Sequence, residues 1–172
     1  NQELKRKYNL LDKKVISTFG LIGPGKGLEL GIKAMVNVAE AHPDSLFLIL
    51  GQTHPMLKKV EGEKYREMLI ELIDELGLGK QVKFVNKFLS DEELGEYLYL
   101  TDVYLSPYPN MDQAVSGTLT FAIGCGRAIV STAYAYAKEV LKNNSGLLAE
   151  KPEPELLADL INNILADENL KR

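Results

Sequence analysis

Residues 15 to 29 read Val15-Ile-Ser-Thr-Phe-Gly-Leu-Ile-Gly-Pro-Gly-Lys-Gly-Leu-Glu29. The β-branched and aromatic run from Val15 to Phe19 is typical of a buried strand. A glycine-rich turn with one lysine follows, and a helix is expected to open near Leu28. Lys26 would then lie, with several backbone N–H groups, between the carboxyl end of a strand and the amino end of a helix, where anions are held. The stretch is compatible with a phosphate site or with a plain connection, and a second matching site would favour the former.

This turn does not match the known short phosphate motifs. A P-loop would need Gly-Lys-Ser/Thr after four variable residues, and the Gly-x-Gly-x-x-Gly spacing of dinucleotide sites is also missing. The candidate phosphate-binding turn therefore consists of Gly23, Gly25, Lys26 and the backbone N–H groups around them.

The composition is that of an ordinary globular protein. The chain has 172 residues, 45% of them hydrophobic and 26% charged, which argues for one well-cored domain and against disorder. A net charge of -4 predicts no nucleic-acid partner. The sequence has no apolar run near the ~20 residues of a transmembrane segment. One cysteine and two distant histidines provide no metal-ligand spacing, so we expect no metal, no other cofactor and a cytoplasmic location.

Residues 1–14 are polar and Lys-rich, and the chain begins with Asn1. This segment is interpreted as a linker entering a domain over residues 15–172, and the chain as a fragment of a two-domain enzyme.

Strands and helices alternate along the rest of the sequence. The strands are apolar runs, which is typical of parallel strands covered on both faces. We therefore predict an α/β fold, a doubly wound and mostly parallel sheet of about six strands with helices on both faces. Further strands are expected at 46–50, 81–85, 102–106, 128–131 and 147–148, and helices at 28–41, 61–76, 90–100, 116–125, 138–142 and 154–166.

Such sheets bind ligands beyond the carboxyl ends of their strands, so the loops after each strand are the candidate sites. The second matching anion site follows the fourth strand, where Ser116-Gly117-Thr118 stands at the start of a helix. Three N–H groups and two hydroxyls converge there. An ordinary Ser N-cap would explain the same residues. The loop before them also carries Tyr108, Asn110, Asp112 and Gln113, which favours a diphosphate held between this helix start and Lys26.

Two other strand ends carry candidates. His54 follows the second strand and precedes Pro55; it is either a surface residue or an acid–base group. Lys87 and Phe88 follow the third strand and could receive a planar base.

Several segments, taken in order, resemble the C-terminal, donor-binding half of family 4 (group 1) glycosyltransferases with the GT-B fold. They are Phe19-Gly-Leu-Ile-Gly-Pro-Gly-Lys-Gly27, His42-Pro-Asp44, Leu46-Phe-Leu-Ile-Leu-Gly51, Val82-Lys-Phe-Val85, Asp102-Val-Tyr-Leu-Ser-Pro107, Cys125-Gly-Arg-Ala-Ile-Val130, Glu139-Val140 and Ser145-Gly-Leu-Leu148. The resemblance extends from the linker-like start to Asp167, and the chain departs from the family pattern at three positions. Leu21 replaces an arginine, and Gln113 and Phe121 occupy the positions of two glutamates, so the chain resembles a divergent branch.

The resemblance implies the Rossmann-like half of a hexosyltransferase. This half would bind a nucleotide-diphosphate sugar donor for polysaccharide or glycoconjugate synthesis. It implies that Gln113 touches the transferred sugar and that Lys26 and residues 116–118 hold phosphate. The catalytic candidates are Gln113, Glu139 and His54. The partner would be an N-terminal acceptor domain of the same polypeptide, so the isolated domain would transfer nothing.

Two alternatives stay open. One is a nucleotide-sugar epimerase or hydrolase of the same architecture, in which His54 would be the acid–base group. The other is a non-catalytic regulatory or interaction domain, which the replacement of both glutamates favours.

Overall fold

The computed structural model describes residues 2–110, 117–141 and 146–166. Six strands form one parallel sheet in the order β3-β2-β1-β4-β5-β6, which confirms the predicted doubly wound α/β fold. In chain order, the elements are α1 (Gln2–Lys7), β1 (Lys14–Phe19), α2 (Leu28–Ala41), β2 (Ser45–Leu50), α3 (Pro55–Glu61), α4 (Lys64–Glu75), β3 (Val82–Val85), α5 (Asp91–Leu100), β4 (Val103–Ser106), α6 (Gly117–Gly124), β5 (Ile129–Thr132), α7 (Ala135–Val140), β6 (Leu147–Ala149) and α8 (Pro154–Ala166).

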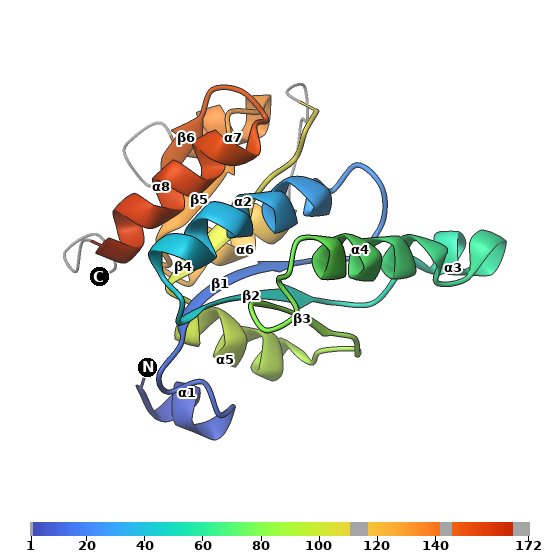
Figure 1. The fold of residues 1–172 in the computed structure, drawn as a ribbon, viewed down its shortest axis with the longest axis horizontal. Coiled ribbons are helices and arrows are strands. Elements are labelled where there is room, and N and C mark those ends of the chain that lie inside the picture. Colours follow the sequence, from blue (N-terminus) through green and yellow to red (C-terminus); the bar gives the residue numbers. More distant parts are fainter. Residues whose placement is uncertain (1, 111–116, 142–145, 167–172) are drawn as a thin grey trace.

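Alternate residues of each central strand enter two separate cores. In β1, Ile16 packs under α2, α4 and α8, whereas Val15 packs under α5, α6 and α7. Every residue of β2 is buried, because both faces of that strand are covered. Figure 1 shows α2 and α8 side by side across one face of the sheet.

The order in which strands are added to the sheet reverses between β1 and β4. The chain adds β2 and β3 on one side of β1, then returns to place β4, β5 and β6 on the other side. The carboxyl ends of β1 and β4 therefore lie next to each other, with connections leading away to opposite sides. Open α/β sheets bind ligands at such a switch point.

The first segment is helical where the sequence predicted a linker. Gln2–Lys7 forms α1, which lies beside α5 (Figure 1). The Lys5 ammonium is buried, 2.8 Å from Asp102 Oδ2, and the same oxygen accepts from the Val15 N–H. Residues 2–7 therefore form a helix that is packed onto the domain. The domain boundary at residue 15 stays a prediction.

One further expectation is corrected around the second crossover. The helix expected at 61–76 begins at Lys64, and a separate helix, α3, precedes it. Gly62, with φ +67°, interrupts the two helices. Since α3 buries none of its residues, it has no periodic apolar face that a sequence pattern could reveal.

Candidate active site

A cavity of about 310 Å³ opens at the carboxyl ends of β1 and β4. Its wall includes Phe19 and Gly20 after β1, Pro107 and Tyr108 after β4, and, from farther along the chain, Thr118. A second cavity of about 190 Å³ lies beside it along the ends of β1, β2 and β3. The two cavities share Phe19, Gly20, Leu21 and Leu50, so together they line a continuous stretch of the carboxyl edge.

Lys26 lines the larger cavity on a turn that only glycine allows. Gly25 and Gly27 have φ of +88° and +76°, in the left-handed region that residues with a Cβ rarely adopt. Within the described residues no carboxylate pairs with the Lys26 ammonium, and none lines this cavity. The Lys26 ammonium faces the ring of Tyr108, whose centre is 5.9 Å from Lys26 Nζ. The cation is therefore available to an anion in the cavity.

The start of α6 meets the same cavity. The helix begins at Gly117, and Thr118 both lines the cavity and lies against Gly20, where a built Cβ would be 3.5 Å from its methyl group. The fold thus brings Lys26 and Thr118 to one site, as the two-part anion hypothesis requires. Ser116 and Gln113 lie outside the described residues.

Tyr104 forms the floor between these two parts. Its side chain is fully buried, and burial raises the pKa of its phenol to about 12, so it stays protonated near neutral pH. Its hydroxyl accepts a long hydrogen bond of 3.5 Å from the Phe19 N–H at the end of β1. The sequence predicts Tyr104 only as part of the strand at 102–106, because nothing in a strand pattern separates a residue at the floor of a cavity from a core residue.

Lys87 and Phe88 line the second cavity, as their position after β3 predicted. Phe88 is 81% exposed and leaves a ring face open. Lys87 lies 2.8 Å from Glu93, and this hydrogen bond raises the pKa of Lys87 and lowers that of Glu93. Glu93 also belongs to a capping box, in which its carboxylate accepts the Ser90 N–H while the Ser90 side chain caps α5.

His54 lines neither cavity. The His54 Nδ1 accepts the Met56 backbone N–H at 3.1 Å and so caps α3. The backbone N–H of His54 donates to the Ile22 carbonyl at 2.8 Å. Gly23 lies nearby, with a built Cβ 4.0 Å from the His54 Cβ. The imidazole therefore has a local structural role, and the acid–base hypothesis gains no support from its position.

The remaining candidates lie on α6 and α7. Glu139 is an exposed residue of α7 and lines neither cavity. Phe121 packs edge-on against Phe19, with ring centres 5.9 Å apart. An apolar contact across the crevice thus takes the place of the carboxylate that the family pattern implies there.

A buried arginine that sequence analysis missed supports the second cavity from behind. Arg66 is 6% exposed, and its Nη2 donates to Asn86 Oδ1 at 2.9 Å and to the Gly51 carbonyl at 3.4 Å. Its Nε donates to Glu63 at 3.1 Å. The arginine thereby joins the loops after β2 and β3. No sequence signal marked it, because a charged residue on an amphipathic helix is normally solvated.

The model of the family described as glycosyl transferases group 1 matches residues 1–172. The chain belongs to the group 1 glycosyl transferases. This confirms the resemblance to group 1 glycosyltransferases. Within the described residues, no cluster of three His, Cys, Asp or Glu side chains could hold a metal ion, and no helix has the length and apolarity to cross a bilayer.

The curated relatives that this chain matches are glycosyltransferases. The chain is 24% identical over 170 residues to the GDP-mannose-dependent alpha-(1-6)-phosphatidylinositol monomannoside mannosyltransferase of Mycolicibacterium smegmatis, covering 95% of this chain and 42% of the relative. It is 28% identical over 160 residues to the D-inositol 3-phosphate glycosyltransferase of Corynebacterium urealyticum, covering 92% and 36%. The chain therefore spans well under half of the relatives that it matches.

Solved structures show the same fold. Anabaena HepE in complex with UDP superposes with a TM-score of 0.85 at 21% identity, covering 99% of this chain and 44% of that one. The C-terminal domain of a group 1 glycosyl transferase, LpcC, from Francisella tularensis superposes with a TM-score of 0.83 at 20% identity, covering 99% and 84%. The α/β architecture is thus that of GT-B glycosyltransferases.

Proposed function

We propose that this chain is the donor-binding half of a glycosyltransferase that uses a nucleotide-diphosphate sugar. The observation that carries the proposal is the meeting of Lys26 with the start of α6 in one cavity. Among the residues that the structure describes, no carboxylate pairs with Lys26 or lines this cavity. A lysine ammonium and the backbone N–H groups of a helix start are complementary to a diphosphate.

The rest of the donor would follow the carboxyl edge. The base would occupy the second cavity, between Lys87 and Phe88, where the exposed ring can stack on a planar heterocycle. The sugar would extend toward Gln113 and Glu139. Two names support a nucleotide donor: one relative is described as GDP-mannose-dependent, and HepE is described in complex with UDP and glucose.

The whole enzyme would have a second domain that supplies the acceptor. The chain's coverage of 36–42% of its relatives supports this arrangement. On this proposal the chain alone binds donor without transferring sugar, and the complete protein works in the cytoplasm on a polysaccharide or glycoconjugate acceptor.

Calorimetric titration of the 172-residue chain with UDP, GDP and ADP tests the proposal. We expect one of them to bind at millimolar concentration or below, and the matching nucleoside, which lacks the diphosphate, to bind much more weakly. Lys26→Ala should weaken binding by about 10- to 100-fold, the usual effect of losing a hydrogen bond to a charged group. Absence of binding by all three nucleotides would contradict the proposal.

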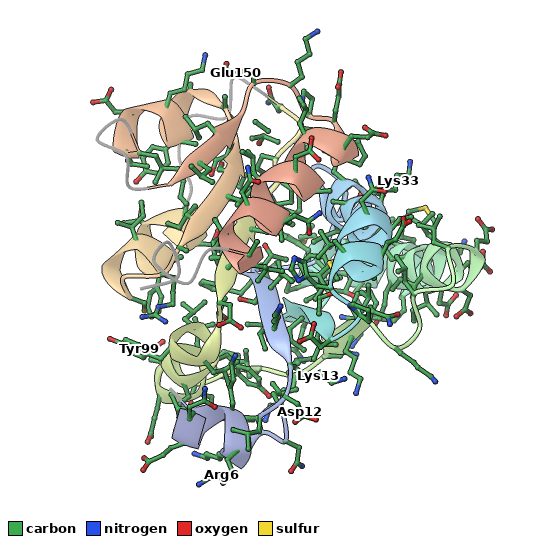
Figure 2. All side chains as sticks on the ribbon, turned by 60° about the vertical axis from the view of Figure 1, so that its left-hand side comes forward. Arg6, Asp12, Lys13, Lys33, Tyr99 and Glu150 are labelled. Carbon is green, nitrogen blue, oxygen red and sulfur yellow. The ribbon has the colours of Figure 1, made fainter. Side chains whose placement is uncertain are left out.

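Lys33→Ala is the matched control. Lys33 is an exposed lysine of α2, and Figure 2 shows it on the helix that follows the Lys26 turn. Its removal changes the net charge as Lys26→Ala does but leaves the cavity intact. Equal losses in both variants would mean that nonspecific charge, and not the cavity, drives the binding.

A further inference from the structure

The Lys26 ammonium stands at the end of a long and flexible side chain. Such a side chain loses rotamer freedom when it holds an anion, and a contact that orders it beforehand reduces that loss. A carboxylate partner would order it but would also neutralise its charge and compete with the incoming phosphate. An aromatic ring attracts a cation through its quadrupole and carries no net charge.

Tyr108 offers such a ring. Lys26 Nζ is 5.9 Å from its centre, inside the roughly 6 Å range of cation–π attraction. Both residues line the larger cavity, and the ring is partly buried, which limits competition from water. This is the contact recorded for the ammonium within the described part of the chain.

The ring is itself held in place by the neighbouring strand and loop. The Tyr108 carbonyl accepts the Thr132 hydroxyl at 2.6 Å, at the end of β5. Its ring packs edge-on against the ring of Tyr134, with centres 5.1 Å apart. Tyr134 is fully buried, and its hydroxyl shares a hydrogen bond of 2.7 Å with Ser106. The ring that faces Lys26 is therefore supported through both its backbone and its side chain.

The two loops are also locked together by backbone contact. A Cβ built on Gly27 would lie 1.8 Å from the Pro107 carbonyl oxygen. The two loops therefore touch at the residues next to Lys26 and Tyr108. Only glycine permits this approach. The spacing between the lysine and tyrosine backbones is consequently set by the fold.

We propose that Tyr108 is a positioning residue for the anion site, whose ring face holds the Lys26 ammonium over the cavity without neutralising it. The use of the site for a diphosphate rests on the proposed function, whereas the ordering of Lys26 by the ring does not. The experiment has one measurement for each statement.

The first measurement needs no ligand. In the chain labelled with ¹³C-lysine, we expect the ε-methylene protons of Lys26 to be shifted upfield by the ring current of Tyr108. The shift should persist in Tyr108→Phe, which keeps the ring, and disappear in Tyr108→Leu. Ordinary lysine shifts in the unmodified chain would overturn the proposal, even if Tyr108→Leu failed to fold.

The second measurement is UDP, GDP and ADP affinity. Tyr108→Leu should weaken the nucleotide that binds by about three- to fivefold, and Tyr108→Phe should restore the unmodified affinity. Added to Lys26→Ala, Tyr108→Leu should cause no further loss. Equal affinity of Tyr108→Leu and the unmodified chain, or failure of Tyr108→Phe to restore it, would overturn the positioning role.

Tyr99→Leu is the control for both measurements. The Tyr99 ring faces Arg127 at 5.6 Å, so it forms the same kind of contact elsewhere. Tyr99 lies near the end of α5, and Figure 2 shows it toward the end of the molecule that carries Arg6. This variant should change neither the Lys26 shifts nor the affinity. If no nucleotide binds the unmodified chain, the proposed function fails, and the Lys26 shifts still decide whether the ring orders the lysine.

Discussion

A Cβ atom on Gly51 would stand 2.1 Å from the carbonyl oxygen of Gly20. Gly51 directly follows β2 and Gly20 directly follows β1, and the Gly20 N–H donates to the Leu50 carbonyl at 3.1 Å. Both have positive φ, +143° for Gly20 and +134° for Gly51. The two segments can approach this closely only because Gly51 has no side chain, and both glycines line the second cavity.

Gly51→Ala should therefore destabilise the chain by at least about 2 kcal/mol, because it combines a strained backbone with a clash against a carbonyl. Urea unfolding measures the loss. Gly79→Ala is the control, since no atom lies within 4 Å of its built Cβ, and it should stay within about 0.5 kcal/mol. Similar losses at both positions would show that the Gly20 contact has no energetic weight.

Arg66→Met should cost about 2–3 kcal/mol, because it removes the hydrogen bonds that a buried guanidinium donates to Glu63, Asn86 and the Gly51 carbonyl. It should also weaken binding of the nucleotide base, since the two loops that it joins carry residues of the second cavity. Thermal unfolding and nucleotide titration give the two readouts. Arg127→Met removes comparable bonds from a more exposed arginine and should cost about 1 kcal/mol or less. Equal costs would contradict the role of burial.

Gly95→Ala should raise the stability by about 0.5–1 kcal/mol. Gly95 lies inside α5, where it has no positive φ and no atom within 4 Å of its built Cβ. Alanine reduces the conformational entropy of the unfolded chain and fits the helix. A lower urea midpoint would show that the space around Gly95 is needed.

The docking of α1 should weaken in acid. Hydrogen bonds from Lys7, and to a smaller extent from Tyr8, lower the pKa of the Glu96 carboxyl in the folded chain. The stability that Glu96 adds to the docking of α1 is therefore present above the unfolded pKa and is lost as the pH falls through the folded pKa. With a reference value of 4.5, the loss begins below about that pH. The centre of the Tyr8 ring lies 4.4 Å from the centre of the Tyr97 ring. The NMR shifts of the Tyr8 ring should therefore move toward those of free tyrosine as the pH falls through this range. Glu96→Gln should remove this pH dependence, and a Tyr8 titration that persisted in that variant would assign it to another group.

Chelation of metal ions should leave nucleotide affinity unchanged. Lys26 and the start of α6 are proposed to balance the charge of the diphosphate, and no metal-binding cluster occurs among the described residues. Titration of the nucleotide with and without excess EDTA checks this. A loss of more than about threefold with EDTA would mean that a cation carries part of the charge balance.

Local sequence patterns predicted much of the fold. The strand at residues 15–19, the helix after it and the helix expected at 90–100 all depend on neighbours a few residues away, and each was found. The patterns missed α3 because it buries no residue, and they missed α1 because its polar sequence docks through the buried Lys5.

The sequence by itself determined the α/β architecture, the glycine-rich turn and the edge of the sheet at which a site should lie, because periodicity and turn chemistry act over short distances. Only the tertiary structure decided which side chains meet at that edge. Lys26 faces the ring of Tyr108, Gly51 touches Gly20, and Arg66 joins two loops from behind. These contacts join segments far apart in the chain, and they exist because parallel strands bring their carboxyl ends together while crossover connections carry the chain back.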